Sequence, residues 1–343
     1  MIELNGYLHA VEAELRDVLT PQEEQIAPLY QMMQYHLGWL DQHFEPNNGN
    51  GSGGKRLRPA MCLLTCEAVG GDWRSALPVA CAIELIHNFS LLHDDIEDCS
   101  ATRRHRTTVW TLWGIAQGIN TGDAMWAISR LTIFRLKQRG HQAETVLRVS
   151  ELLDQSCLEL CTGQYLDIQF ESEDGVALPT YERMILGKTA ALLSGALGAG
   201  AIVGGASDPI VQAYQDFGRE LGLTFQITDD ILGIWGDPQV TGKSAASDIL
   251  TKKKTLPVLY AFQWEREQGY TDLQRIYSQQ TVSSEDVPAV LALLDRAGAL
   301  TYARRQAKEH QAKTLAHLDA TQITHPAQAR LRELALSIVD RSH

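Results

Sequence analysis

Residues 77–98 read LPVACAIELIHNFSLLHDDIED, and this stretch decides the fold. Residues 77–92 are mostly apolar without the alternation of a strand, which predicts a helix built for a protein interior over 75–98. The stretch nevertheless ends on four acids, Asp94, Asp95, Glu97 and Asp98. Like charges crowded at the end of a buried helix need an explanation, either as a solvated helix end or as a site for cations.

Helical periodicity continues on both sides of this stretch and dominates the chain. We expect helices over residues 8–18, 25–43, 58–69, 75–98, 109–138, 141–170, 181–203, 209–234, 256–267, 284–298 and 301–340. Residues 46–54, 171–179 and 236–254 have the composition of loops, and no segment alternates like a strand. The sequence therefore predicts an all-α, single-domain bundle over residues 1–343, made of long, mostly antiparallel helices.

The bulk composition is that of a soluble globular protein, with 44% apolar and 21% charged residues. A formal net charge of −12 argues against nucleic-acid binding, which needs a basic face. Residues 190–206 are at the short limit for a membrane span and rich in Ala and Gly, so we expect a buried helix there. The N-terminus lacks the apolar run of a signal peptide, and we expect a cytoplasmic protein.

The acids at the end of the 75–98 helix have a spacing that suits a metal ion. Positions i and i+4 share a helix face, so Asp94 and Asp98 project together, with His87 two turns earlier on the same side. Mg²⁺ is typically held by one or two carboxylates together with water and substrate phosphates. A solvated, acid-rich helix end is the alternative, because charge runs usually lie at the surface.

Two further features favour the metal site. A second acid pair, Asp229 and Asp230, lies near the end of another apolar helix. Basic clusters stand close to the helix ends in an otherwise acidic protein: residues 53–59 (GGKRLRP), residues 103–106 (RRHR), Lys188, Lys243 and residues 252–254 (KKK). Acids, Mg²⁺ and Arg or Lys together are how proteins hold polyphosphates.

With these segments assembled, the chain resembles the trans-isoprenyl diphosphate synthases of the polyprenyl synthetase family over nearly its whole length. The segments that carry the resemblance are GGKRLRP, HNFSLLHDDIED, TRRHRTTVW, GDAMWAIS, GKTAALL, FQITDDILGIWGD and GKSAASDILTKKKTLP. The resemblance implies the isoprenoid synthase fold, in which helices surround a central apolar cavity. It also implies a Mg²⁺-dependent prenyltransferase that joins isopentenyl diphosphate to an allylic diphosphate, with about three ions per active site, acting as a homodimer.

The resemblance also implies roles for individual residues. Four would bind the diphosphate of isopentenyl diphosphate: Lys55, Arg58, His87 and Arg104. Asp94 and Asp98 would hold two Mg²⁺ ions on the allylic diphosphate, and Asp229 a third. Arg103, Lys188 and Lys253 would contact that diphosphate, with Lys243 close by. Thr189 and Gln226 would point their dipoles at the reacting carbons.

The chain departs from the family pattern in two places. The second acid motif, residues 229–233, is commonly D-D-x-x-D, but its fifth position is Gly233. The usual R-R-G-x-P-T is R-R-H-R-T-T, in which we interpret His105 and Thr107 as loop variation. We expect activity to survive the missing acid, since water can complete the coordination of Mg²⁺.

In relatives, the length of the product depends on the size of the side chains just before the first acid motif, residues 94–98. Phe89 and Ser90 occupy that place, and the motif carries no insertion. We therefore expect geranylgeranyl diphosphate as the product, with farnesyl diphosphate next.

Two other functions fit part of the pattern. A class I terpene cyclase on the same scaffold also ionises an allylic diphosphate, but it has no use for the second diphosphate site. A non-catalytic subunit of a heteromeric synthase would be expected to have lost metal-ligating acids. The complete first motif and the residues assigned to isopentenyl diphosphate favour chain elongation over both.

Overall fold

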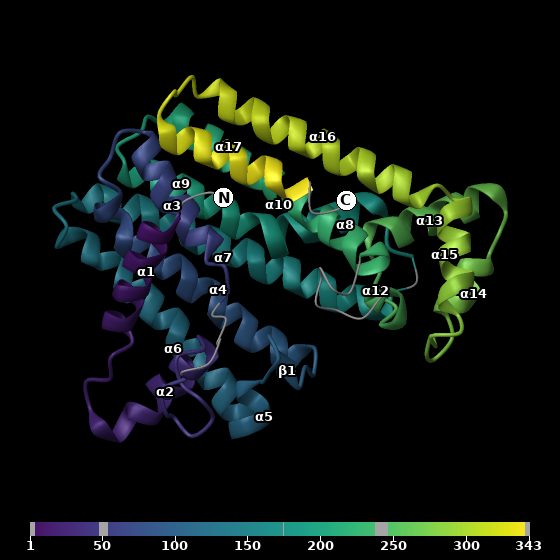
Figure 1. Ribbon diagram of the computed structural model, residues 1–343, viewed down its shortest axis with the longest axis horizontal. Coiled ribbons are helices and arrows are strands. Elements are labelled where there is room, and N and C mark those ends of the chain that lie inside the picture. Colours follow the sequence, from purple (N-terminus) through teal and green to yellow (C-terminus); the bar gives the residue numbers. More distant parts are fainter. Residues whose placement is uncertain (1–3, 48–53, 174, 237–245, 340–343) are drawn as a thin grey trace. The chain divides into compact units, whose positions relative to one another are not determined.

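The computed structural model describes residues 4–47, 54–173, 175–236 and 246–339, and the prediction of an all-α fold is confirmed (Figure 1). The α-helices are α1 (Asn5–Val18), α2 (Ala27–His36), α3 (Leu57–Ala68), α4 (Leu77–Glu97), α5 (Val109–Trp113), α6 (Ile115–Ile133), α7 (Ala143–Ser172), α8 (Leu178–Ile185), α9 (Ala191–Val203), α10 (Asp208–Trp235), α12 (Ser247–Leu250), α13 (Leu256–Gln268), α14 (Asp272–Tyr277), α15 (Val287–Arg296), α16 (Ala299–Ala320) and α17 (Pro326–Val339). Short 3₁₀ turns are η1 (Glu24–Ile26), η2 (Trp73–Ala76) and η3 (Phe134–Lys137), and η4 (Leu186–Ala190) is a π-helical segment.

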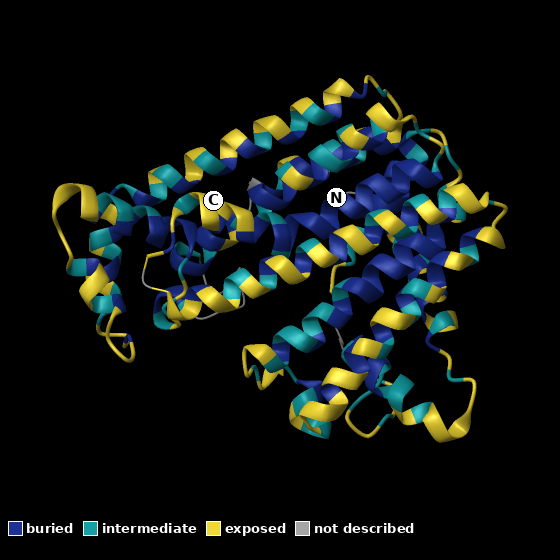
Figure 2. Ribbon diagram, turned by 180° about the vertical axis from the view of Figure 1, so that it is seen from behind, coloured by how far each residue is buried: buried dark blue, intermediate teal, exposed yellow. Residues whose placement is uncertain are grey.

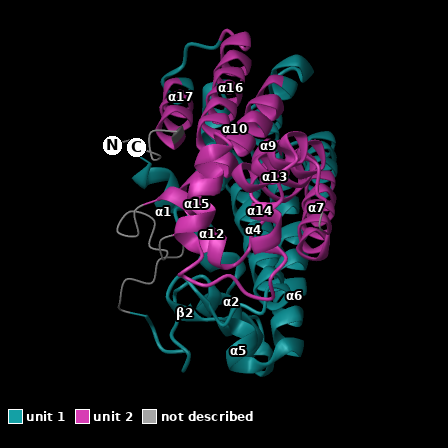
Figure 3. Ribbon diagram, turned by 90° about the vertical axis from the view of Figure 1, so that its right-hand side faces the viewer, with its two compact units in different colours: residues 1–154, 195–212, 323–328 teal, residues 155–194, 213–322, 329–343 magenta. Residues whose placement is uncertain are grey.

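The chain divides into two compact units, coloured separately in Figure 3. Unit 1 comprises residues 1–154, 195–212 and 323–328, and unit 2 comprises residues 155–194, 213–322 and 329–343. The boundaries fall inside α7, α9, α10 and α17, so both units contain parts of the same helices. That residues 1–343 form a single domain around a central apolar cavity stays a prediction.

Helix α4 is the core of unit 1 and packs against α6, α3 and α1. Pro78 stands in its first turn, where its fixed φ favours a helix start and its missing N–H costs nothing. Ile83 and Leu85 are completely buried, and burying each such side chain stabilises the fold by about 2 kcal/mol. The helix is apolar on nearly every side because neighbours cover nearly every side.

Unit 2 has its own core, in which α13 contacts α8, α14, α15 and α16. Ala303 and Ala307 on α16 are buried one turn apart, while the outer side of this helix is exposed (Figure 2). From α10, Ile227, Ile231 and Ile234 enter the same apolar cluster at helical spacing. This spacing leaves the neighbouring positions of α10 free to carry polar side chains.

Several element boundaries differ from those expected. The helix expected over 109–138 is interrupted at Gly114, whose φ of 87° ends α5 before α6 begins. The helix expected over 301–340 is two helices, because the chain turns at Gln322 with a φ of 56°. The expected loop 236–254 contains α12, and residues 272–277 form α14, which periodicity over so few residues could not reveal.

Two strands of two residues each, β1 (Thr102–Arg103) and β2 (Arg106–Thr107), were also not expected. They pair antiparallel, with Thr102 opposite Thr107 and Arg103 opposite Arg106.

Two helical stretches are long and apolar enough to cross a membrane by length and composition, Trp73–Glu97 and Leu178–Val203. Of their most apolar windows, 78% and 83% of the residues are buried inside the protein. Burial by protein explains their apolarity, as expected for residues 190–206.

Candidate active site

The first acid motif lies at the C-terminal end of α4 in unit 1. Asp98 is the C-cap residue, and its N–H donates to the carbonyl of Asp94 at 2.9 Å, so the two residues are one turn apart. The negative end of a helix dipole disfavours carboxylates there. These acids therefore need cations close by, which makes the end of α4 a place where a positive charge is stabilised.

Arg103 supplies one such charge. Its Nη2 donates to Asp94 Oδ2 at 2.7 Å and its Nε to Asp95 Oδ1 at 2.6 Å. Burial lowers the pKa of Arg103, but the carboxylates of Asp95 and Asp94 outweigh this and raise it. Burial raises the pKa of Asp95, with Arg103 opposing that rise. Arg103 thus holds the two adjacent acids of the motif together.

The hairpin of β1 and β2 explains how Arg103 and Arg104 are presented. Arg104 and His105 form its two-residue loop, with φ values of 51° and 62°. Positive φ at both central positions is typical of a type I′ hairpin turn, where glycine and asparagine are usual. His105 therefore occupies a turn position, which fits the interpretation as loop variation.

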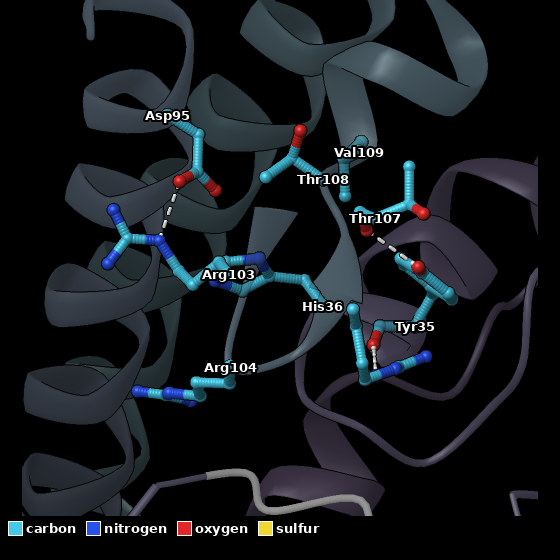
Figure 4. A pocket seen from close by; sticks show the side chains of 9 residues that line it. Tyr35, His36, Asp95, Arg103, Arg104, Thr107, Thr108 and Val109 are labelled. Atoms are coloured by element: carbon cyan, nitrogen blue, oxygen red, sulfur yellow. Dashed lines mark hydrogen bonds and ion pairs between the residues drawn. The ribbon is translucent and has the colours of Figure 1, made fainter. Parts of the chain in front are cut away.

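The third arginine of this hairpin anchors it. Arg106 donates to the carbonyls of Tyr35 and Leu40, each at 2.6 Å, and stacks over the Tyr35 ring at 4.0 Å. Figure 4 shows Arg103 turned toward Asp95 and Tyr35 turned toward Thr107. A cavity of about 20 Å³, lined by His36, Asp95 and the three arginines, lies between them.

A second cationic group lies elsewhere in unit 1. Arg58 Nη1 is 3.4 Å from His87 Nε2. Burial and the Arg58 and Arg104 charges hold the pKa of His87 well below its usual value, so the imidazole is neutral. Glu84 is 2% exposed, accepts from Asn88 Nδ2 at 3.0 Å, and lies 3.9 Å from Arg56 Nε. This buried carboxylate balances the arginines around it.

Other expected residues of unit 1 are placed as follows. Lys55 is exposed just before α3, and Ser90 donates to the carbonyl of His87 at 2.8 Å. Phe89 is 7% exposed and meets the His93 ring edge-on at a centroid distance of 5.8 Å. Phe89 therefore has a fixed position five residues before the first acid motif.

In unit 2, the π-helical segment η4 presents Lys188 and Thr189. Gly187 of this segment faces Gly163 of α7, and a Cβ on Gly163 would lie 2.0 Å from the Lys188 nitrogen. No side chain other than hydrogen fits there, so the two backbones touch. Lys188 Nζ then reaches Asp167 Oδ2 at 2.5 Å, one turn along α7 from Gly163. Single π turns inside helices are frequent at functional sites.

A buried polar network holds the second acid motif. Thr189 Oγ1 donates to Gln226 Oε1 at 3.0 Å, and Gln226 Nε2 donates to Asp230 Oδ1 at 3.1 Å. The other oxygen of Asp230 accepts from the Tyr181 hydroxyl and from the Leu256 N–H. Burial raises the pKa of Asp230 to about 6. Asp230 is thus committed to positioning Gln226, whereas Asp229 is exposed.

The three consecutive lysines have separate partners. Lys254 Nζ donates to the carbonyls of Phe170 and Glu173 at the end of α7, each at 2.5 Å, and Lys252 Nζ donates to that of Gln279. Local desolvation lowers the pKa of Lys253, but Asp230, Asp248 and Asp167 outweigh it and raise that pKa. Lys253 therefore lies close to these carboxylates, and its contact with diphosphate stays a prediction. Lys243 lies outside the described residues.

The donor set suits Mg²⁺ shared with a substrate better than a metal caged by protein alone. Over the described ranges, no three His, Cys, Asp or Glu side chains are gathered as a metal site. Mg²⁺ is usually held by one or two carboxylates, water and phosphate oxygens. The carboxylates of Asp94 and Asp98 in unit 1, and of Asp229 in unit 2, fit that requirement.

Sequence reasoning missed the supporting acids Glu84 and Asp167 and the roles of Asp230 and Tyr181. Glu84 is a lone acid inside an apolar helix, a signal that could have indicated a buried partner for arginine. Asp167 follows Gly163 by four residues, on the same face of α7. Tyr181 left no such signal, because its partner is distant in sequence.

The comparisons with known proteins agree with this chemistry. The polyprenyl synthetase family model matches residues 39–294. The chain is 37% identical over 337 residues to (2E,6E)-farnesyl diphosphate synthase of Mycobacterium tuberculosis, covering 95% of this chain and 91% of that protein. It is 41% identical over 292 residues to geranylgeranyl diphosphate synthase of the same organism, covering 85% and 81%.

A solved structure gives the same result for the fold. Geranylgeranyl pyrophosphate synthase from Corynebacterium glutamicum, complexed with isoprenyl diphosphate and magnesium, superposes with a TM-score of 0.84 at 28% identity, covering 99% of each chain. Motifs, fold and relatives therefore lead to one conclusion: this chain belongs to the polyprenyl synthetase family.

Proposed function

We propose that the protein catalyses the Mg²⁺-dependent head-to-tail condensation of isopentenyl diphosphate with an allylic diphosphate. The observation that carries this is that two cationic side chains of unit 1 have different partners. Arg103 binds the acids of the first motif, while Arg58 lies against the neutral His87. Two distinct cationic groups match two diphosphate substrates, which a single-substrate cyclase would not need.

The proposed residue roles follow from this division. Lys55, Arg58, His87 and Arg104 bind isopentenyl diphosphate, and the neutral His87 contributes a hydrogen bond without adding a charge that would repel the neighbouring arginines. Arg103, Lys188 and Lys253 bind the allylic diphosphate, with Lys243 assigned beside them. Asp94, Asp98 and Asp229 are the metal ligands, for about three ions.

The chemistry required is cleavage of the allylic carbon–oxygen bond. When bound, Mg²⁺ supplies electrostatic stabilisation of the negative charge that develops on the leaving diphosphate. Arg103, Lys188 and Lys253 are preorganised by carboxylate partners and stabilise the same charge. The carbonyl dipole of Gln226, held by Thr189 and Asp230, is aligned to stabilise a nearby carbocation. Apolar walls exclude water, which would otherwise trap that cation.

The decisive experiment supplies dimethylallyl, geranyl and farnesyl diphosphates with labelled isopentenyl diphosphate and identifies the products by mass. Labelled prenyl diphosphates of increasing length are expected. A hydrocarbon formed without isopentenyl diphosphate would instead indicate a cyclase. Turnover that needs an added partner chain would indicate a non-catalytic subunit.

We propose geranylgeranyl diphosphate as the main product, with farnesyl diphosphate next. Phe89 is fixed by its neighbours and adjoins Ser90, which lies one turn before Asp94, so Phe89 can act as the floor of the prenyl pocket. Phe89→Ala should lengthen the product by at least one isoprene unit, because removing the ring opens the space below the growing tail. An unchanged product distribution would place the floor elsewhere.

We further propose a cytoplasmic homodimer. Ile115, Ile119 and Trp126 of α6 are all at least 40% exposed, and at 3.6 residues per turn they fall within about 40° of one another around the helix, as one apolar face. Such a face is usually covered by another protein surface. Light scattering should give a dimer for wild type and a monomer for the double variant Ile119→Glu/Trp126→Glu. Leu336→Glu, at an exposed apolar position of α17, is the matched control and should stay dimeric.

A further inference from the structure

Gly233, the fifth position of the second acid motif, is filled by a carboxylate from elsewhere in the chain. A Cβ built on Gly233 would lie 2.1 Å from Oδ2 and 2.4 Å from Cγ of Asp248. Distances this short mean that Asp248 occupies the volume in which a side chain at 233 would begin. The glycine and the aspartate are therefore a matched pair, and both belong to unit 2.

The local backbone delivers Asp248 to this position. Ala246 enters α12 in the left-handed region, with φ 53° and ψ 34°, and Lys252 leaves it with a φ of 56°. The N–H of Lys253 donates to the carbonyl of Asp248 at 2.8 Å, which ties the turn to the lysine assigned to diphosphate binding. Asp248 is 8% exposed, so its carboxylate is held in place rather than solvated.

The place that Asp248 takes is the right one for a metal-site acid. Residues 229 and 233 share one face of α10, and a helix rises about 6 Å over four residues. A carboxylate at the Cβ position of 233 is therefore a one-turn neighbour of Asp229, as Asp98 is of Asp94. Its other polar contact is weak, a 3.4 Å hydrogen bond from Ser247 Oγ to Oδ1.

We propose that Asp248 supplies the third carboxylate of the second acid motif, in the space that an acid at position 233 takes in the usual D-D-x-x-D pattern. The missing acid is thereby replaced from a neighbouring turn, and Gly233 is the residue that makes room for it. This proposal rests on the proposed metal role of Asp229. It predicts that restoring an acid at 233 is harmful unless Asp248 is removed.

A competing explanation is that Asp248 only balances the charge of Lys253. Asp248→Asn distinguishes the two explanations, because the amide keeps the shape and packing of the side chain but cannot serve as an anionic ligand of the metal. Loss of charge balance alone would weaken diphosphate binding, but with diphosphate at saturation it would leave the affinity for Mg²⁺ unchanged.

The experiment is calorimetric titration of Mg²⁺ into the full-length protein at a saturating concentration of inorganic diphosphate, with no catalysis involved. Asp248→Asn should weaken Mg²⁺ binding about tenfold, the usual effect of losing a supporting carboxylate at a metal site. The double variant Gly233→Asp/Asp248→Gly should recover most of that loss, whereas Gly233→Asp alone should itself weaken Mg²⁺ binding, because its side chain collides with Asp248. Asp295→Asn, at an exposed acid of α15, is the control and should titrate like wild type.

Each outcome has a distinct meaning. If Asp229→Asn weakens Mg²⁺ binding and Asp248→Asn does not, the inference about Asp248 is wrong and the metal role of Asp229 stands. If Asp229→Asn also leaves Mg²⁺ binding unchanged, the proposed metal role itself fails. If the double variant binds Mg²⁺ no better than Asp248→Asn, the claim that Asp248 takes the place of an acid at position 233 is wrong. Circular dichroism spectra of all variants identify any that fail to fold.

Discussion

Tyr181 and Tyr277 offer a test in which one chemical change has opposite effects at two buried positions of unit 2. The Tyr181 hydroxyl is buried and donates to the carboxylate of Asp230. The Tyr277 hydroxyl is equally buried but, among the residues that the structure describes, has no hydrogen-bond partner. Replacing either tyrosine by phenylalanine removes a single oxygen and preserves the ring.

The expected magnitudes follow from these contacts. Tyr181→Phe removes a hydrogen bond to a charged group, which should lower the free energy of unfolding by about 2 kcal/mol. Tyr277→Phe removes a hydroxyl that is desolvated without compensation, which should raise it by about 1 kcal/mol. The two variants should therefore differ by about 3 kcal/mol, although both lose one hydroxyl.

Urea denaturation followed by circular dichroism measures this difference. For a slope of about 3 kcal/mol per molar urea, the midpoint should fall by about 0.7 M for Tyr181→Phe and rise by about 0.3 M for Tyr277→Phe. Equal midpoints for the two variants, or a larger loss for Tyr277→Phe, would refute the reasoning. Tyr181→Phe should also lower kcat, since Asp230 would hold Gln226 less firmly.

Three other predictions concern the acid motif, the glycine contact and a buried histidine. Asp94→Ala should abolish Mg²⁺-dependent condensation, measured with labelled isopentenyl diphosphate, while the thermal midpoint stays within a few degrees, because a helix-end acid adds little to the core. Gly163→Ala should lower the free energy of unfolding by more than about 2 kcal/mol, because its Cβ would overlap the backbone nitrogen of Lys188 and the backbone cannot easily move away. Gly175→Ala is the control, since its Cβ would meet no atom within 4 Å. Equal urea midpoints for the two variants would contradict this prediction. Burial and the charges of Arg104, Arg103 and Arg106 lower the pKa of His36 to about 3. Because the unfolded chain takes up this proton below pH 6.5 and the folded protein does not, His36 should lower the stability by about 1 kcal/mol per pH unit between roughly pH 6 and pH 4. In urea titrations the slope of stability against pH should be smaller by this amount for His36→Asn, with the contribution of His87 remaining.

The fold could be predicted from the sequence where long apolar periodicity was present, as in α4, α7 and α10. It could not be predicted where one or two backbone angles decide the outcome. Gly114 and Gln322 end helices through positive φ, and the hairpin of β1 and β2 is too short to carry an alternating pattern. In each case the deciding information is local strain rather than hydrophobic pattern.

The candidate site shows the same division. Asp94, Arg103, Thr189 and Gln226 were identified from their motifs, and the structure pairs Asp94 with Arg103 and Thr189 with Gln226. The contribution of Asp248 could not be predicted, because its meeting with Gly233 depends on two left-handed residues that flank α12. The partners of the three consecutive lysines likewise depend on the folded chain: Lys252 and Lys254 donate to backbone carbonyls, and Lys253 lies close to carboxylates.

The contact of Arg103 with Asp94 and Asp95 has a thermodynamic consequence. One guanidinium is assigned to the allylic diphosphate, yet in the structure it neutralises an acid assigned to the metal. A divalent cation that takes over Asp94 would free part of this guanidinium for the diphosphate, and a bound diphosphate would in turn draw Arg103 away from the acid. Metal and diphosphate should therefore each increase the affinity for the other, and by reciprocity the two factors must be equal. Arg103 would thus neutralise the acids while the site is empty, and it would make the binding of metal and diphosphate cooperative.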